Sequence, residues 1–251
     1  MFFDHPGNPP GESDPFEDES DQVTSDLDYL WKQFQGVAPL FPLGNLTLLP
    51  NVVQPFHMFE PRYRELAEDA VEGDGFIALA ILNPQSDSSY ESKAAGIFPH
   101  VCLGKITQYE PLPEGRWNLI VRGLWRASVD HELDGDEAYR RAALDVIEEP
   151  AVPVTDATLE HRDELVRLFK AVQPKLAEYP VIKQVLAQDL PLGLLTDFVA
   201  HALDLSPMAG ASLLEEADPV RRCAFLERLL ATHLRSQSDD DRPFPPPFSV
   251  N

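Results

Sequence analysis

The chain has 251 residues, 43% of them hydrophobic and 25% charged, which is the composition of a folded globular protein. Its formal net charge of −22 argues against a nucleic-acid-binding protein, because such proteins need Lys and Arg to neutralise phosphates. The apolar runs are far shorter than the ~20 residues of a membrane-spanning helix, and the N-terminus lacks the features of a secretory signal. We therefore expect a cytoplasmic protein that binds neither nucleic acid nor membrane.

The two ends of the sequence differ in composition from the rest. The first 28 residues contain nine acidic residues and no Lys or Arg, and residues 1–22 are also rich in Pro, Gly and Ser. We interpret residues 1–22 as a disordered acidic tail, and residues 237–251 as a second tail that is acidic and Pro-rich. The Pro-rich segment favours polyproline geometry, and it is either a ligand for a groove or an end without a role.

A short helix is predicted within residues 23–37. Thr24 or Ser25 can cap its N-terminus, and Gly36 can end it. Its apolar face follows the spacing of one helical side and consists of Leu27, Leu30, Trp31 and Phe34.

Residues 38–150 show the patterns of β-strands. Residues 40–43 and 46–50 are short apolar runs, and the prolines among them restrict such strands to edges or bends of a sheet. Residues 76–82 are continuously apolar, as in a strand that is buried on both faces.

A hairpin is predicted in the second half of this region. Residues 101–109 and 116–123 flank a turn, and further strands fit residues 124–132 and 139–147. Many short strands interrupted by Pro and Gly indicate a small barrel or sandwich.

One helix interrupts the strands at residues 61–72. Pro61 suits the first helical position, and Gly73 supplies a stop. Its apolar face has helical spacing and consists of Tyr63, Leu66, Ala67, Ala70 and Val71.

From residue 156 onward the apolar period is helical. A long stripe reaches Tyr179, and shorter helices fit residues 181–188, 192–203, 207–215 and 219–235. The predicted fold class is therefore α+β: a β-rich lobe of residues 38–150 with one inserted helix, followed by an α-helical lobe of residues 151–236.

Searches for catalytic and metal-binding motifs mostly find nothing, and the spacing of the seven histidines indicates no cluster, which leaves only one assembled by folding as an alternative. Gly104-Lys105 lacks the rest of a phosphate-binding loop, and His161 has no second histidine four residues later. His57 is better explained as packed and hydrogen-bonded than as catalytic, and Cys102 and Cys223 as buried thiols. We therefore expect no enzymatic activity, no cofactor and no metal site.

Several segments together resemble the N-terminal, substrate-binding domain of Lon proteases. The most specific is the string Phe59-Glu60-Pro61-Arg62-Tyr63-Arg64, and the apolar runs at residues 39–43 and 48–50 precede it as in that family. Residues 114–126 resemble the hairpin of the family, and residues 195–200, 213–215 and a helix near 222–230 resemble its helical end. The resemblance covers about residues 38–235.

The resemblance implies a pseudo-barrel lobe followed by a helical lobe. In full-length Lon proteases this region helps to engage substrates and to organise the oligomer, and ATPase and Ser–Lys protease modules follow it. We expect this chain to lack both modules, and Ser92-Lys93 is not a catalytic dyad. The implied function is ATP-independent, non-catalytic recognition of unfolded or peptide segments in protein quality control, which is an argument by analogy of fold.

The candidate peptide-binding residues are Phe41, Phe59, Arg62, Tyr63, Arg122 and Trp125. In this hypothesis Arg62 holds a carboxylate and Tyr63 stacks on the peptide. Alternatively, Glu60 and Arg62 brace the helix start and Tyr63 packs inward, which helical spacing favours. The same two interpretations apply to the aromatic side chains of Phe59, Trp117 and Trp125.

Three functions predict different surfaces. Peptide recognition predicts a contiguous apolar groove, expected between the lobes. A small-molecule-binding or enzymatic module predicts a deep enclosed pocket with converging polar groups such as His57, His100 or Arg122. An architectural subunit predicts a large apolar self-association patch, and the oligomeric state is not determined by the sequence.

Overall fold

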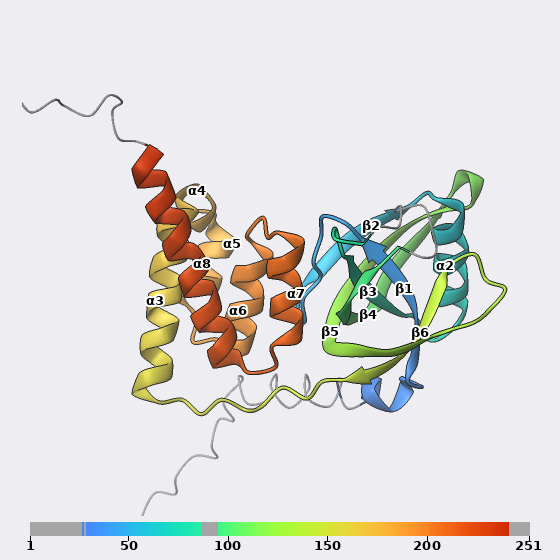
Figure 1. The fold of residues 1–251 in the computed structure, drawn as a ribbon, viewed down its shortest axis with the longest axis horizontal. Helices are drawn as coiled ribbons and strands as arrows, with labels where there is room; N and C mark the ends of the chain where they lie inside the picture. The colour runs from blue at the N-terminus through green and yellow to red at the C-terminus, as the bar shows by residue number, and fades with distance from the viewer. Residues whose placement is uncertain (1–26, 28, 87–94, 241–251) are drawn as a thin grey trace, which may run out of the picture. The chain divides into compact units, whose positions relative to one another are not determined.

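A computed structural model describes residues 27, 29–86 and 95–240. The predicted tail of residues 1–22 and most of the tail of residues 237–251 lie outside the described residues. Leu27 and residues 29–33 are helical, and Gly36 has a positive φ of 82°. The elements described below all belong to one compact unit, Gly36–Asn251 (Figure 1).

The strands of the described chain form one mixed sheet. They are β1 (Val37–Leu43), β2 (Val53–Met58), β3 (Phe76–Leu82), β4 (Ile97–Leu112), β5 (Arg116–Leu133) and β6 (Arg140–Val146), in the order β2-β5-β4-β3-β1-β6. The C-terminal part of β5 also pairs with β6, so the sheet returns onto itself. The result is a pseudo-barrel rather than a regular barrel, because β2 extends outward from β5.

β1 lies inside the sheet, but each of its prolines is in a part of the strand that has a neighbouring strand on one side only. β1 pairs with β3 through residues 40–43 and with β6 through residues 37–40. Pro39 therefore has a strand partner only on the β6 side, and Pro42 only on the β3 side. Each proline therefore has one flank without a partner strand, where a missing N–H costs no ladder hydrogen bond.

The two strands of the predicted hairpin are longer in the structure than the sequence pattern indicates. Residues 116–123 and 124–132, predicted as separate strands, are parts of the single strand β5. The run at residues 46–50 is not a strand, although Leu48 and Leu49 are buried. This segment instead crosses β5 at Gly123, whose N–H donates to Val52 O at 2.8 Å. Any Cβ at Gly123 would overlap the carbonyl of Leu49, which explains the glycine.

Helix α2 (Pro61–Glu72) has the predicted bounds and buries Tyr63, Leu66, Ala67 and Ala70. The glycine that redirects the chain after α2 is not the predicted one. Gly73 has a φ of −88°, so it does not adopt the left-handed conformation; Gly75 does, with a φ of 72°. The turn that leads into β3 therefore depends on Gly75.

The helical lobe consists of α3 (Asp156–Val172), α4 (Pro174–Ala177), α5 (Pro180–Ala187), α6 (Leu192–His201), α7 (Pro207–Glu215) and α8 (Pro219–Asp240). The predicted long stripe is divided at Pro174, which has no N–H to continue α3. Helix α8 packs against α3 and α6, and α7 contacts β3, β4 and β5 (Figure 1). Among the described helices, none combines the length and apolarity needed to cross a bilayer.

A continuous hydrophobic core extends from the sheet into the helices. It includes Phe41, Leu66 and Ile81 in the β-rich lobe and Leu214 and Leu226 in the helical lobe. The observed fold class is α+β, with a β-rich pseudo-barrel that carries one helix and a C-terminal helical part.

Candidate functional site

The outward side of β2 carries exposed apolar side chains. Among the described strands, β2 pairs only with β5, in a register that places Val53 opposite Arg122, Pro55 opposite Ile120 and His57 opposite Asn118. Alternate residues of a strand project to the same side. Val53 is 53% exposed and Phe59, just after β2, is 61% exposed.

A row of polar side chains crosses this side of the sheet. The Asn118 amide nitrogen donates to Glu110 Oε2 at 3.0 Å, so the Asn118 oxygen is the acceptor for His57 Nδ1 at 2.9 Å. The His57 ring also stacks on Phe59, with 6.1 Å between ring centroids and 21° between ring planes. The row therefore holds His57 in one orientation, with Nδ1 as a hydrogen-bond donor.

These residues border a hollow of about 450 Å³. Its lining mixes apolar and polar groups from three adjacent strands: Pro55, Phe56, His57, Gln108, Tyr109, Glu110, Asn118, Leu119 and Ile120. We call the outward surface formed by Val53, Pro55, His57, Phe59, Glu110, Asn118 and Ile120 the β2 face. Such a surface offers apolar contacts beside carboxylate and amide groups, and it borders an edge strand.

Phe41 and Tyr63 lie in the core. Their rings meet edge to face with 4.7 Å between centroids, and both side chains are buried. Arg62 forms an ion pair with Glu60 at 2.9 Å and lies 4.5 Å from the centroid of the Tyr63 ring. In this conformation these residues brace the start of α2, as in the alternative interpretation of the sequence.

The other predicted residues lie apart from that cluster. Trp125 is half-buried and stacks on Phe76, with 6.4 Å between ring centroids. Arg122 is half-buried and opposite Val53, at the end of β2 away from Phe59. The structure therefore brings Phe59 and Arg122 to the β2 strand, and it does not gather all six residues.

Val53, Glu110 and Asn118 were not predicted as site residues. Pro55 is a signal for Val53 alone, because a proline favours an edge strand and Val53 lies on the same strand. Their grouping could not be read from the sequence, because Glu110 and Asn118 lie on the two arms of a hairpin and His57 lies 61 residues before Asn118.

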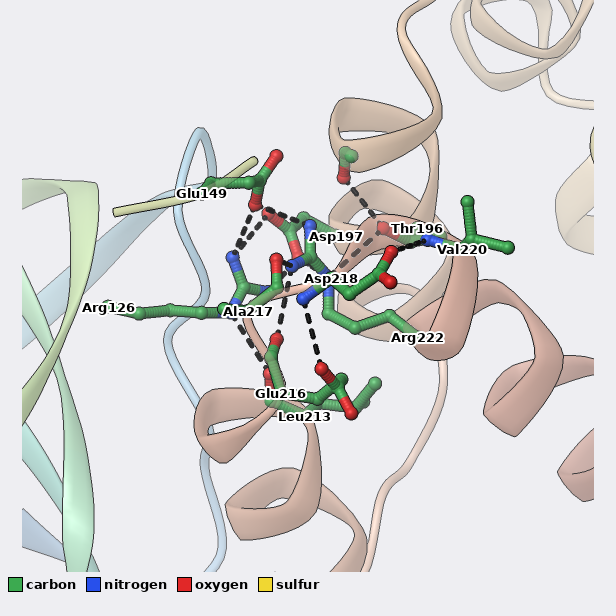
Figure 2. Close-up of polar contacts among 11 residues, drawn as sticks. Arg126, Glu149, Thr196, Asp197, Leu213, Glu216, Ala217, Asp218, Val220 and Arg222 are labelled. Carbon is green, nitrogen blue, oxygen red and sulfur yellow. Dashed lines mark hydrogen bonds and ion pairs between the residues drawn. The ribbon is translucent and has the colours of Figure 1, made fainter. Parts of the chain in front are cut away.

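A buried ion cluster joins the β-rich lobe to the helices (Figure 2). Arg126 of β5 pairs with Asp197 of α6 through both terminal guanidinium nitrogens, and its Nε donates to the Leu213 carbonyl of α7 at 3.0 Å. Arg222 of α8 pairs with Glu149 at 2.6 Å and donates to the Ala217 carbonyl at 2.8 Å. Glu149 also accepts from Arg126 at 3.3 Å.

The cluster balances two cations against two carboxylates. Burial raises the pKa of the Asp197 carboxyl, and the charges of Arg126 and Arg222 act in the opposite direction. Burial likewise lowers the pKa of the Arg222 guanidinium, which the charges of Asp197 and Glu149 oppose. Since Arg126 is 3% and Asp197 2% exposed, we interpret the cluster as a structural joint. A hollow of about 590 Å³ opens beside the cluster on the α7 and α8 side, and its lining includes Leu213 and Arg222. The groove predicted between the lobes stays a prediction.

The architecture is that of the N-terminal domains of Lon proteases. The solved N-terminal domain of the Mycobacterium avium complex Lon protease superposes with a TM-score of 0.61 at 22% identity, over 78% of this chain and 99% of that one. The Lon N-terminal domain protein from Xanthomonas campestris gives a TM-score of 0.54 at 23% identity, over 78% and 97% of the two chains. At these identities the likeness concerns the fold.

Sequence comparison assigns the family. The model of the ATP-dependent protease La (LON) substrate-binding domain matches residues 37–232, so this chain belongs to that family. The Lon protease of Aquifex aeolicus is 30% identical over 204 residues, and that of Geobacter metallireducens 26% over 194 residues. The matches cover 76% and 74% of this chain but only 24% and 22% of those proteins, so the chain spans about a quarter of their length.

Proposed function

We propose that this chain recognises unfolded or extended segments of other proteins without ATP and without catalysing a reaction, and that they bind at the β2 face. The observation that carries this proposal is the edge strand β2 with its outward side chain Val53, and Phe59 just after the strand; both are more than half exposed. Isolated exposed apolar residues are common, but here they lie on or beside an edge strand whose residues Pro55 and His57 line a hollow.

The chemistry of the β2 face suits an extended polypeptide. An edge strand can pair its outer backbone groups with an added strand, and alternate side chains of that strand then meet the sheet surface. The row His57–Asn118–Glu110 supplies hydrogen-bonding groups beside the apolar positions. The hollow mixes polar and apolar lining in a way that tolerates varied side chains.

The same surface gives less support to a small-molecule or enzymatic role. That role requires polar groups to converge in an enclosed pocket. The hollow that contains His57 is not lined by His100 or Arg122. Peptide recognition therefore accounts better for the open, mixed surface at the sheet edge.

The proposal includes partners and a location. The partners are segments of proteins rather than nucleic acids, because a chain of net charge −22 repels phosphate. The location is the cytoplasm, with a role in protein quality control; the two cysteines support it, because both are unpaired thiols.

The proposal can be tested with a fluorescently labelled protein that cannot refold because it is reduced and carboxymethylated. The measurement is fluorescence anisotropy without nucleotide and again with ATP. The test variant is Phe59→Ala, and the matched control is Tyr179→Ala, because Tyr179 is 62% exposed but lies between α4 and α5. Loss of an interface aromatic costs about 1–2 kcal/mol, so we expect about 5- to 30-fold weaker binding for Phe59→Ala alone.

Saturable binding that is independent of ATP and reduced only by Phe59→Ala supports the proposal. Equal loss in both variants would place binding elsewhere or make it nonspecific. Absence of binding by the unmodified chain would eliminate generic recognition of unfolded protein.

A further inference from the structure

Three potential metal ligands meet between α3 and α8, away from the β2 strand. His161 of α3 faces Cys223 and Glu227 of α8, and one ligand atom from each lies within 4.8 Å of the others. His161 Nδ1 is 2.9 Å from Glu227 Oε1, and Cys223 Sγ is 3.6 Å from the same oxygen.

This cluster cannot be recognised in the sequence because α3 and α8 are far apart in the chain. Cys223 and Glu227 are four residues apart on one helix, so their side chains lie on the same side of α8. Helix α3 packs along α8 and brings His161, 62 residues before Cys223, to that side. Sequence motifs detect ligands at short spacing and therefore miss such a group.

Two of the three separations between the ligand atoms are close to those of a tetrahedral site, and the third, between a ring nitrogen of His161 and Cys223 Sγ, is within 4.8 Å. Bonds of about 2.3 Å to sulfur and 2.0 Å to oxygen or nitrogen place the ligand atoms of such a site about 3.3–3.5 Å apart. The sulfur–oxygen separation of 3.6 Å matches this spacing, and the nitrogen–oxygen separation of 2.9 Å needs to widen by a few tenths of an ångström.

The surroundings leave room for exchange with solvent. Cys223 is buried, whereas the His161 side chain is 36% exposed and that of Glu227 18% exposed. A fourth coordination position can therefore be filled by water from the His161 side.

We propose that His161, Cys223 and Glu227 form a binding site for a divalent transition metal, with Zn²⁺ as the fitting ion. The donor set of thiolate, imidazole and carboxylate suits Zn²⁺, whereas Mg²⁺ and Ca²⁺ take oxygen ligands. Binding displaces the proton of the thiol and ties α3 to α8. The site is independent of the β2 face, and its occupancy stabilises the helical lobe.

Titration of the full chain with Co²⁺ tests the site, because a Co²⁺–thiolate bond gives a charge-transfer absorption and four-coordinate Co²⁺ gives intense visible bands. Zn²⁺ added afterwards should remove both. Cys223→Ala and Glu227→Gln are the test variants. Cys102→Ala is the matched control, because Cys102 is the other buried thiol and lies in β4.

Even outer partners of metal ligands contribute about 10- to 100-fold to affinity, so loss of one ligand should weaken Co²⁺ binding by at least about 100-fold. Cys102→Ala should bind Co²⁺ as the unmodified chain does. Zn²⁺ should raise the Tm of the unmodified chain and of Cys102→Ala, and leave that of Cys223→Ala unchanged.

Absence of the charge-transfer band in the unmodified chain would overturn the proposal. Its persistence in Cys223→Ala would do so as well, because the metal would then be bound through another thiol. Circular dichroism of each variant distinguishes loss of the site from loss of the fold.

Discussion

Arg126 on β5 and Asp197 on α6 form a two-pronged ion pair across the seam between the lobes, although 71 residues separate them in the sequence. Both side chains are almost completely buried, so each charge depends on the other for compensation. The second arginine, Arg222, lies 3.7 Å from the same carboxylate and brings α8 into the joint. The attachment of the helical lobe to the sheet therefore has an electrostatic component that can be measured.

Removal of one partner from this joint should be strongly destabilising. Arg126→Met leaves the Asp197 charge buried without its main partner, and we expect a loss of about 3–5 kcal/mol in the free energy of unfolding. The double variant Arg126→Met with Asp197→Leu should lose less than the sum of the two single changes. Urea unfolding of the four proteins gives the coupling. Arg167→Met, which breaks an exposed pair with Glu164, serves as a control without measurable change.

The aromatic residues near α2 should separate into structural and surface groups. Tyr63→Ala removes a buried ring that packs on Phe41, and it should cost about 3–5 kcal/mol in the free energy of unfolding. Phe59→Ala truncates a side chain that is 61% exposed, so its stability should change by less than about 0.5 kcal/mol. Chemical denaturation of both variants measures the difference. A Tyr63→Ala protein as stable as the unmodified chain would contradict its place in the core.

Gly210 of α7 should resist substitution because of a close contact with the β-rich lobe. A Cβ at this position would overlap Thr47 Oγ1 and lie 3.1 Å from Thr47 Cβ. Gly210→Ala should lower the free energy of unfolding by about 1–3 kcal/mol, despite the better helix propensity of Ala. Addition of Thr47→Ala should recover most of the loss. Thermal unfolding of the single and double variants measures these changes in stability. A Gly210→Ala variant more stable than the unmodified chain would refute the contact.

Tyr139 should make the stability depend on alkaline pH. Its hydroxyl donates to Asp69 Oδ2 at 2.7 Å, and burial, together with this hydrogen bond, raises the pKa of the phenol. Above about pH 10 the unfolded chain releases the Tyr139 proton while the folded chain retains it. The free energy of unfolding of the unmodified chain should therefore fall, relative to that of Tyr139→Phe, as the pH rises above 10. Urea unfolding at several alkaline pH values checks this; parallel curves would show that the phenol is not linked to folding.

Several elements could be predicted from local sequence because a single physical cause sets each one. Pro61 and the apolar spacing up to Ala70 place α2 at its observed bounds, and the unbroken apolar run of β3 indicates burial on both faces. The prolines of β1 also followed their steric rule, but only the pairing register showed that each lies on a single-sided stretch.

Local sequence could not assign the sites. The apolar spacing of α2 predicted that Tyr63 packs inward, yet the grouping of His57 with Asn118, of Arg126 with Asp197 and of His161 with Cys223 depends on strand register and helix packing. A side chain and its hydrogen-bonding partner can lie anywhere in the sequence, whereas helical and strand periodicity arise within a few residues. Thus the sequence by itself determined the family resemblance, the α+β class and the main helices. The tertiary structure decided which polar groups meet, because those contacts form only when distant segments pack together.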